Sequence, residues 1–141
     1  MPEQKKISPG RLDAYTLSEV LVVLVIIGIL VLIALPNLLP VITRAKNTEA
    51  KLQLKHLYTL EKNYYYEYSR YSDNLEELGF LQEKLSTDGK DGHANYRIEV
   101  RSSGPAGFVA RATAVLDFNG DGKFNVWEID QDKNLKEVTR D

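Results

Sequence analysis

The chain has 141 residues, 43% of them hydrophobic, with no cysteine and a formal net charge of −2. A chain of this length forms at most one globular domain, and a near-neutral charge provides no general basic field for binding nucleic acid. Without cysteine no disulfide can form, so a small folded region needs another source of stability.

An apolar run lies close to the start of the chain. Every residue from Val20 to Leu35 is apolar or glycine. A helix that crosses the hydrocarbon core of a bilayer needs about 20 such residues. The run reaches that length only when it is counted from Leu17 to Leu39, which places Glu19 inside it. We therefore predict a transmembrane helix with one carboxylate near its start.

The carboxylate of Glu19 predicts a functional site. A charged side chain inside a membrane costs at least ~2.5 kcal/mol, so it is expected to have a positively charged partner. One alternative is a plain signal anchor in which Glu19 reaches the membrane interface. A cleaved secretory signal is the other, but no A-x-A-like cleavage site follows the run. We therefore expect the run to be retained in the working protein.

The string Ala-Tyr-Thr-Leu-Ser-Glu, residues 14–19, resembles the processing site of type IV prepilins and type II secretion pseudopilins. In that family a short basic leader ends in Gly, followed by Phe, Thr, Leu, any residue and Glu. Here Ala14 replaces the Gly and Tyr15 replaces the Phe. The residues that match the family directly are Thr16, Leu17, Glu19, Gly28 and Pro36.

This resemblance implies a route of assembly. A prepilin peptidase would cleave between Ala14 and Tyr15, and the new amino group would be methylated. Glu19 of one subunit would then neutralise the terminal ammonium of its neighbour, and we expect this amine to be the only group that satisfies the carboxylate. The implied partners are the peptidase, an inner-membrane assembly platform, the membrane before assembly and identical subunits in a filament.

The resemblance also implies a location. The protein would cross the inner membrane once, with its head outside the cytoplasm, and would then enter a periplasmic or extracellular filament. Within the helix, Pro36 and Pro40 predict a kink or a locally unwound stretch, because each removes a backbone hydrogen bond.

After the prolines, apolar residues at spacings of three, four or seven predict an amphipathic helix that ends near Tyr68. Its apolar stripe consists of Leu54, Leu57, Tyr58, Tyr65 and Tyr68. A turn should follow at residues 71–74, and a short helical turn should end at Gly79.

The rest of the chain predicts a small antiparallel sheet. Tyr96, Ile98 and Val100 alternate with charged residues, which is typical of a half-buried strand. Further strands are predicted at 108–116, 124–129 and 135–138, with a hairpin turn at 132–134. The expected fold is α+β and pilin-like, with a long N-terminal helix packed on the sheet. The expected segments are a leader (1–14), a transmembrane and assembly helix (15–40), an amphipathic helix (41–71) and a β-sheet head (72–141).

Residues 117–128, DFNGDGKFNVWE, match the calcium-loop pattern D-x-[DN]-x-[DN]-G-x5-E. The pattern predicts side-chain oxygen ligands, a backbone carbonyl from Lys123 and a closing carboxylate from Glu128. The full predicted set is Asp117, Asn119, Asp121, Lys123, Asn125 and Glu128. Because the flanking segments are predicted strands, this is no helix-loop-helix site, and a turn that binds nothing is the alternative. A calcium ion here would be structural, with folding coupled to its binding.

No sequence motif supports an enzyme, since the nucleophile, Walker and dinucleotide patterns are missing. Three functions remain open: a type IV pilus subunit, the major pseudopilin of a type II secretion system, and a membrane-anchored calcium-binding module that does not polymerise. The leader and Glu19 count against the third. The calcium-like motif and the lack of a disulfide-bounded loop favour the pseudopilin over the pilus subunit.

Overall fold

The computed structural model of the protein describes residues 14–141, except for the side chain of Leu39. The predicted leader therefore lies outside the described residues, apart from Ala14. The chain divides into two compact units, Met1–Leu38 and Leu39–Asp141. Each unit is described by itself.

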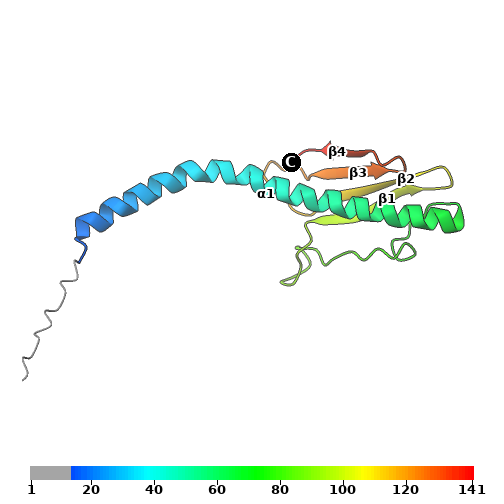
Figure 1. Cartoon of the computed structure of the whole chain (residues 1–141), viewed down its shortest axis with the longest axis horizontal. Coiled ribbons are helices and arrows are strands. Elements are labelled where there is room, and N and C mark those ends of the chain that lie inside the picture. Colours follow the sequence, from blue (N-terminus) through cyan, green and yellow to red (C-terminus); the bar gives the residue numbers. More distant parts are fainter. Residues whose placement is uncertain (1–13) are drawn as a thin grey trace, which may run out of the picture. The chain divides into compact units, whose positions relative to one another are not determined.

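A single helix, α1 (Leu17–Tyr68), belongs to both units and contains 52 residues (Figure 1). The unwound stretch that we predicted near Pro36 and Pro40 is absent, because both prolines lie within the helix. Each proline removes only one hydrogen bond of the helix. The bonds of the neighbouring turns are sufficient to keep this segment helical.

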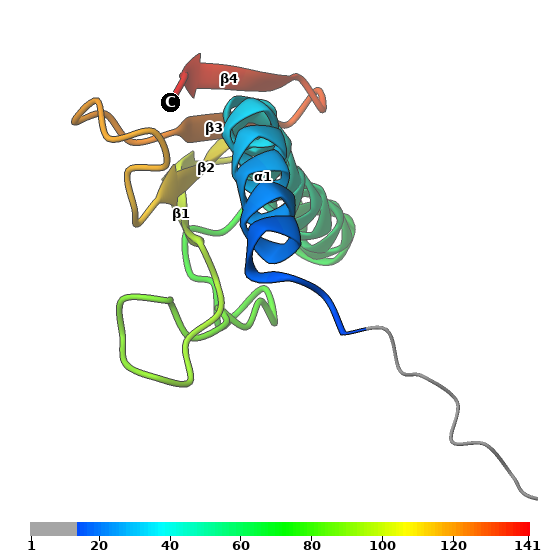
Figure 2. The same ribbon diagram turned by 90° about the vertical axis from the view of Figure 1, so that its left-hand side faces the viewer.

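The second unit contains a four-stranded antiparallel sheet with the order β1-β2-β3-β4 (Figures 1 and 2). The strands are β1 (Tyr96–Ser103), β2 (Phe108–Ala114), β3 (Val126–Asp130) and β4 (Leu135–Thr139). This arrangement confirms the predicted α+β fold. β2 ends two residues earlier than predicted, and β3 begins two residues later and ends one residue later than predicted. The Ala114 N–H donates to the Asn125 carbonyl at 2.8 Å, where the two strands separate into the loop.

The core of this unit lies between α1 and one face of the sheet. Ala50, Leu54 and Leu57 of α1 are each 0% exposed. Successive side chains of a strand point to opposite faces, so alternate residues of the sheet meet the helix. The buried sheet residues are Tyr96, Ile98, Phe108, Ala110, Ala112, Ala114, Trp127 and Ile129.

The apolar stripe of α1 differs from the predicted one at its end. Tyr68 is 57% exposed and packs against Tyr64 in a tilted arrangement, with ring centroids 4.5 Å apart. The buried stripe instead continues from Leu57 to Glu61, which is 0% exposed. A carboxylic acid thus occupies a position where the helical spacing of three and four residues requires a buried side chain.

Candidate functional site

The start of α1 forms the first candidate site. Thr16 directly precedes the helix, and its backbone N–H donates to Glu19 Oε2 at 2.7 Å. In return the Glu19 N–H donates to Thr16 Oγ1 at 3.3 Å. This reciprocal pair is a capping box, which satisfies two N–H groups that the first turn of a helix leaves without partners.

The capping box changes the interpretation of Glu19. We expected only the amine of a neighbouring subunit to satisfy this carboxylate, but Thr16 of the same chain also binds it. The helix dipole stabilises a negative charge at this end as well. The spacing Thr-x-x-Glu is readable in the sequence, and it is the signal that the sequence-based interpretation missed.

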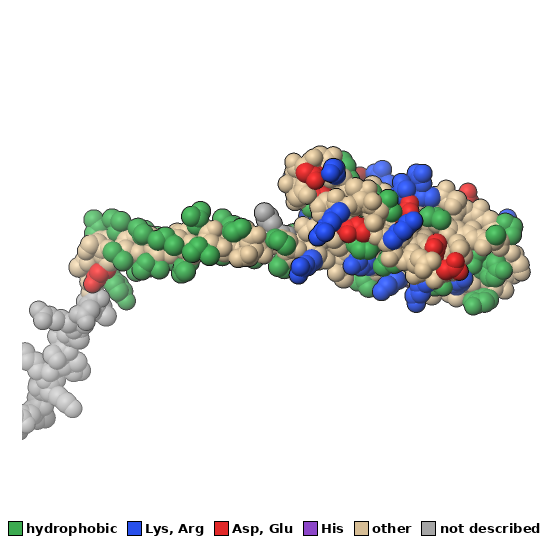
Figure 3. Space-filling model, turned by 90° about the horizontal axis from the view of Figure 1, so that it is seen from above, with side chains coloured by type: hydrophobic (Ala, Val, Ile, Leu, Met, Phe, Trp, Pro, Cys, Tyr) green, Lys and Arg blue, Asp and Glu red, His purple; other side chains and the backbone are tan. Residues whose placement is uncertain are grey.

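The apolar residues after Glu19 cover the surface of α1 in the first unit (Figure 3). The large apolar side chains from Val20 to Leu38 are 47% to 73% exposed. Their mean hydropathy reaches 3.1, and the helix is long and apolar enough to cross a membrane. A surface of this kind needs lipid or other protein chains to cover it.

The structure brings together only part of the predicted assembly set. Thr16 and Glu19 bind each other, and Tyr15 lines a surface hollow beside Glu19. Leu17 is 83% exposed, and Gly28 and Pro36 lie further along α1. A Cβ atom on Gly28 would meet nothing within 4 Å. The part that these three positions play in assembly stays a prediction.

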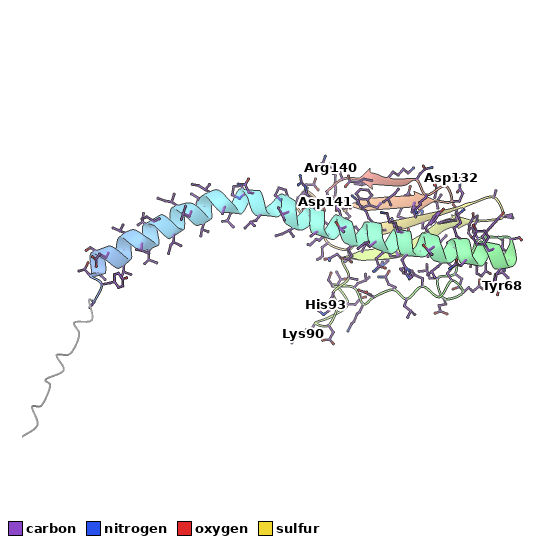
Figure 4. All side chains as sticks on the ribbon, viewed as in Figure 1. Tyr68, Lys90, His93, Asp132, Arg140 and Asp141 are labelled. Atoms are coloured by element: carbon purple, nitrogen blue, oxygen red, sulfur yellow. The ribbon has the colours of Figure 1, made fainter. Side chains whose placement is uncertain are left out.

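The loop between β2 and β3 forms the second candidate site. Asp117, Asp121 and Asp141 each offer a carboxylate oxygen, and these three atoms lie within 4.8 Å of one another. Asp141, labelled in Figure 4, follows β4 and was not part of the predicted set. It is twenty residues from Asp121 in the sequence, so no local spacing could have revealed it.

Backbone hydrogen bonds shape this loop. Asp117 accepts the N–H of Gly120 at 2.6 Å and that of Gly122 at 2.7 Å. These bonds, with Gly122 as the main contributor, hold the pKa of Asp117 below its ordinary value. Gly120 and Gly122 have φ angles of 80° and 83°, a conformation that favours glycine. The sharp turn predicted at Gly122 is therefore present.

The other predicted loop residues also take part in this network. Asn119 Oδ1 accepts the N–H of Asp121 at 2.8 Å, and Asp121 Oδ1 accepts the N–H of Lys123 at 2.8 Å. The carboxylate of Asp141 accepts the N–H groups of Phe118 at 2.8 Å and Asn119 at 3.1 Å. The last residue of the chain thus fastens the loop to the sheet.

Glu128 does not close the acidic cluster as predicted. It lies in β3 between Trp127 and Ile129, whose side chains face the core, so its own side chain lies on the opposite face. There its Oε1 accepts two hydrogen bonds from Arg111, at 2.9 and 2.6 Å. The strand register, which pairs Arg111 with Glu128, determines this contact.

Asn125 also has a different role from the predicted one. It is 0% exposed and accepts a hydrogen bond from the Tyr96 hydroxyl at 2.8 Å. Its amide donates to Glu137 at 2.7 Å and to the Thr139 carbonyl at 3.1 Å. Asn125 therefore links β1 to β4 inside the head, with its side-chain oxygen and amide both engaged there.

These features define a class of protein: a chain with an exposed apolar helix, an acid at the start of that helix and a small antiparallel sheet. The family model described as the prokaryotic N-terminal methylation motif matches residues 13–35. The chain is also 47% identical over 74 residues to the type IV major pilin protein PilA of Myxococcus xanthus (strain DK1622). By this motif and this identity, the chain is similar to type IV pilins over part of its length.

The match to PilA is partial. It covers 52% of this chain and 34% of the relative, so the chain matches about a third of that protein's length. The relative is described as a major pilin.

Proposed function

We propose that the chain is the subunit of a type IV pilus-like filament. A prepilin peptidase removes the leader after Ala14, and an inner-membrane platform then adds the subunit through α1. The methylation motif at residues 13–35 and the similarity to a major pilin support this proposal. The motif is common to pilins and pseudopilins, so the similarity to a major pilin is what supports a pilus over a secretion pseudopilus, between which the sequence alone leaned only slightly toward the pseudopilin.

The observation that carries the proposal is the apolar surface of α1 in the first unit. Its side chains have no cover within the part of the chain that the structure describes. Before assembly the membrane covers them. In a filament that extends away from the membrane, only helices of neighbouring subunits can bury this surface, and its burial drives association.

Glu19 determines how neighbouring subunits align along their helices. In a filament the carboxylate moves from the polar membrane interface to an apolar environment, where an unpaired charge is costly. The free amine of Tyr15 on the next subunit carries the opposite charge. Since the capping box already uses Oε2, the pairing adds to the local contact with Thr16 and does not replace it.

We further propose that the loop at 117–123 holds a structural calcium ion together with Asp141. The donors fit a hard cation, because they are three carboxylates with oxygens within 4.8 Å of one another. Their mutual repulsion would fall when a divalent cation neutralises them. The ion would then fasten Asp141 and the end of β4 to the loop.

Electron microscopy of material sheared from cells tests the filament proposal. We expect long filaments that contain this chain and disappear when its gene is deleted. If deletion instead abolishes protein secretion while no long surface filament contains the chain, the protein is a pseudopilin. If the chain stays in the membrane in both assays, the polymer proposal is contradicted.

A further inference from the structure

Glu61 is a buried acid with incomplete hydrogen bonding. Its side chain is 0% exposed, and its Oε2 accepts the backbone N–H of Ser72 at 3.1 Å. Its Oε1 is also buried and has no partner among the described residues. An ionised carboxylate with a free buried oxygen is unfavourable, whereas a protonated one is tolerated.

The charged groups near Glu61 do not offset an ionised carboxylate. Asp73 lies on the segment that follows α1 and repels a negative charge. Lys62 is adjacent in the helix, but its ammonium donates to the Tyr71 hydroxyl at 3.0 Å. Among the described residues, no lysine or arginine forms an ion pair with Glu61.

Other ionisable groups of the surrounding segments are also engaged elsewhere. Glu77 accepts a hydrogen bond from the Ser72 hydroxyl at 2.9 Å, and Arg70 donates to the Tyr64 hydroxyl at 3.4 Å. From the β3–β4 turn, the ammonium of Lys133 lies 5.6 Å from the centre of the Tyr58 ring. Burial therefore dominates, and it raises the pKa of Glu61 to about 7.

Glu61 binds a segment whose backbone is left-handed at both ends. We name residues 69–79, which follow α1, the strap. Ser69 and Gly79 have φ angles of 53° and 72°, whereas the strap between them is packed, with Leu78 6% exposed. The strap also lines a cavity of about 370 Å³ together with the β1–β2 turn. Tyr71 also links the strap to the head, because its N–H donates to the Gly104 carbonyl at 3.3 Å and its ring stacks on Tyr65. The bond from Ser72 to Glu61 is the link whose acceptor is a buried acid.

We propose that Glu61 is a pH-dependent switch that holds the strap on α1 when its carboxyl group is protonated and loosens the strap when the group ionises. The inference concerns the head alone and is independent of the filament proposal. In the protonated state one oxygen accepts the Ser72 N–H and the other carries the proton. Ionisation leaves a buried charge, and the strap can relieve it by moving away and admitting water.

The direction of the pH effect follows from the raised pKa. The ordinary pKa of the side chain is 4.5, and that in the fold is about 7. The folded state therefore binds the proton more tightly than the unfolded state. The stability that depends on it is fully present below about pH 4.5 and is lost as the pH rises through about 7.

Amide hydrogen exchange of the full chain in detergent tests this switch. We expect the amides of Ser72 to Gly79, corrected for intrinsic rates, to exchange at least about tenfold faster at about pH 8 than at about pH 5.5. Glu61→Gln, which keeps an acceptor for the Ser72 N–H and cannot ionise, should abolish this difference. The matched control Glu67→Gln removes an exposed acid of the same helix and should leave the difference unchanged.

Two results would overturn the switch. One is equal protection of the strap at both pH values in the wild type. The other is a strap in Glu61→Gln that still opens with pH as in the wild type. If this variant fails to fold, the carboxyl carbon resonance of Glu61 in the wild-type chain decides. A titration midpoint near 7 supports the switch, and an ordinary midpoint below about 5 contradicts it.

Discussion

Glu19→Gln is expected to abolish filament assembly while membrane insertion and the start of α1 stay intact. Glutamine can accept the Thr16 N–H as glutamate does, because a capping box forms with either residue. The substitution therefore removes the negative charge alone. Leaving one partner of a buried ion pair without the other costs about 3–5 kcal/mol, which weakens subunit association by more than about a hundredfold.

The matched variant is Thr16→Ala, which removes the reciprocal bond from the Glu19 N–H and retains the charge. Loss of such a cap costs about 1 kcal/mol, so this variant should still assemble. Membrane fractions and sheared surface fractions are measured for both variants. Wild-type filament yield from Glu19→Gln would show that Glu19 acts as a helix cap and that charge pairing is dispensable.

Calcium is expected to raise the melting temperature of the head by roughly 10–20 °C. Extracellular calcium modules bind with Kd values of about 0.1–1 mM. At a hundredfold excess of ligand over Kd, binding adds about 2.7 kcal/mol, and each kcal/mol shifts the Tm of a small domain by about 4–8 °C. Trp127 is the single tryptophan and lies in β3, so its fluorescence reports melting of the sheet in the full detergent-solubilised chain.

Asp121→Asn should remove the calcium response, because it takes one carboxylate from the group of three. Asp88→Asn, in a turn outside that group, should keep the response.

Asn125→Ala distinguishes the role that the structure gives Asn125, a buried hydrogen-bond partner, from the calcium-ligand role that the sequence motif predicted. It should lower stability by about 1–3 kcal/mol, since Tyr96 and Glu137 lose a buried partner. It should still respond to calcium. Identical melting curves with calcium and with chelator in the wild type would contradict the calcium proposal.

The fold was predictable because its elements have clear periodicities. Tyr96 and Ile98 alternate with charged residues, and they are buried in β1 as a period of two requires. The long helix followed from an apolar run and a helical stripe, of which Leu54 and Leu57 are fully buried. Glu61 could not be predicted in this way, because a stripe defined by apolar residues excludes a buried acid.

The loop site was predicted only in its local part. Spacing along the chain identified Asp117 and Asp121, which are four residues apart and lie together. The same pattern assigned Glu128 to the site, although the strand that contains it directs its side chain to Arg111. Asp141 approaches the loop through the pairing of β3 with β4, and sequence spacing carries no information about such a contact.

The central claim is that the chain loses its leader and polymerises through the new end of α1. Mass spectrometry of the subunit in sheared filaments tests it most directly. We expect an N-terminal peptide that begins with a methylated Tyr15. A filament subunit that still begins at Met1 would have no amine for Glu19 at this position and would contradict the claim.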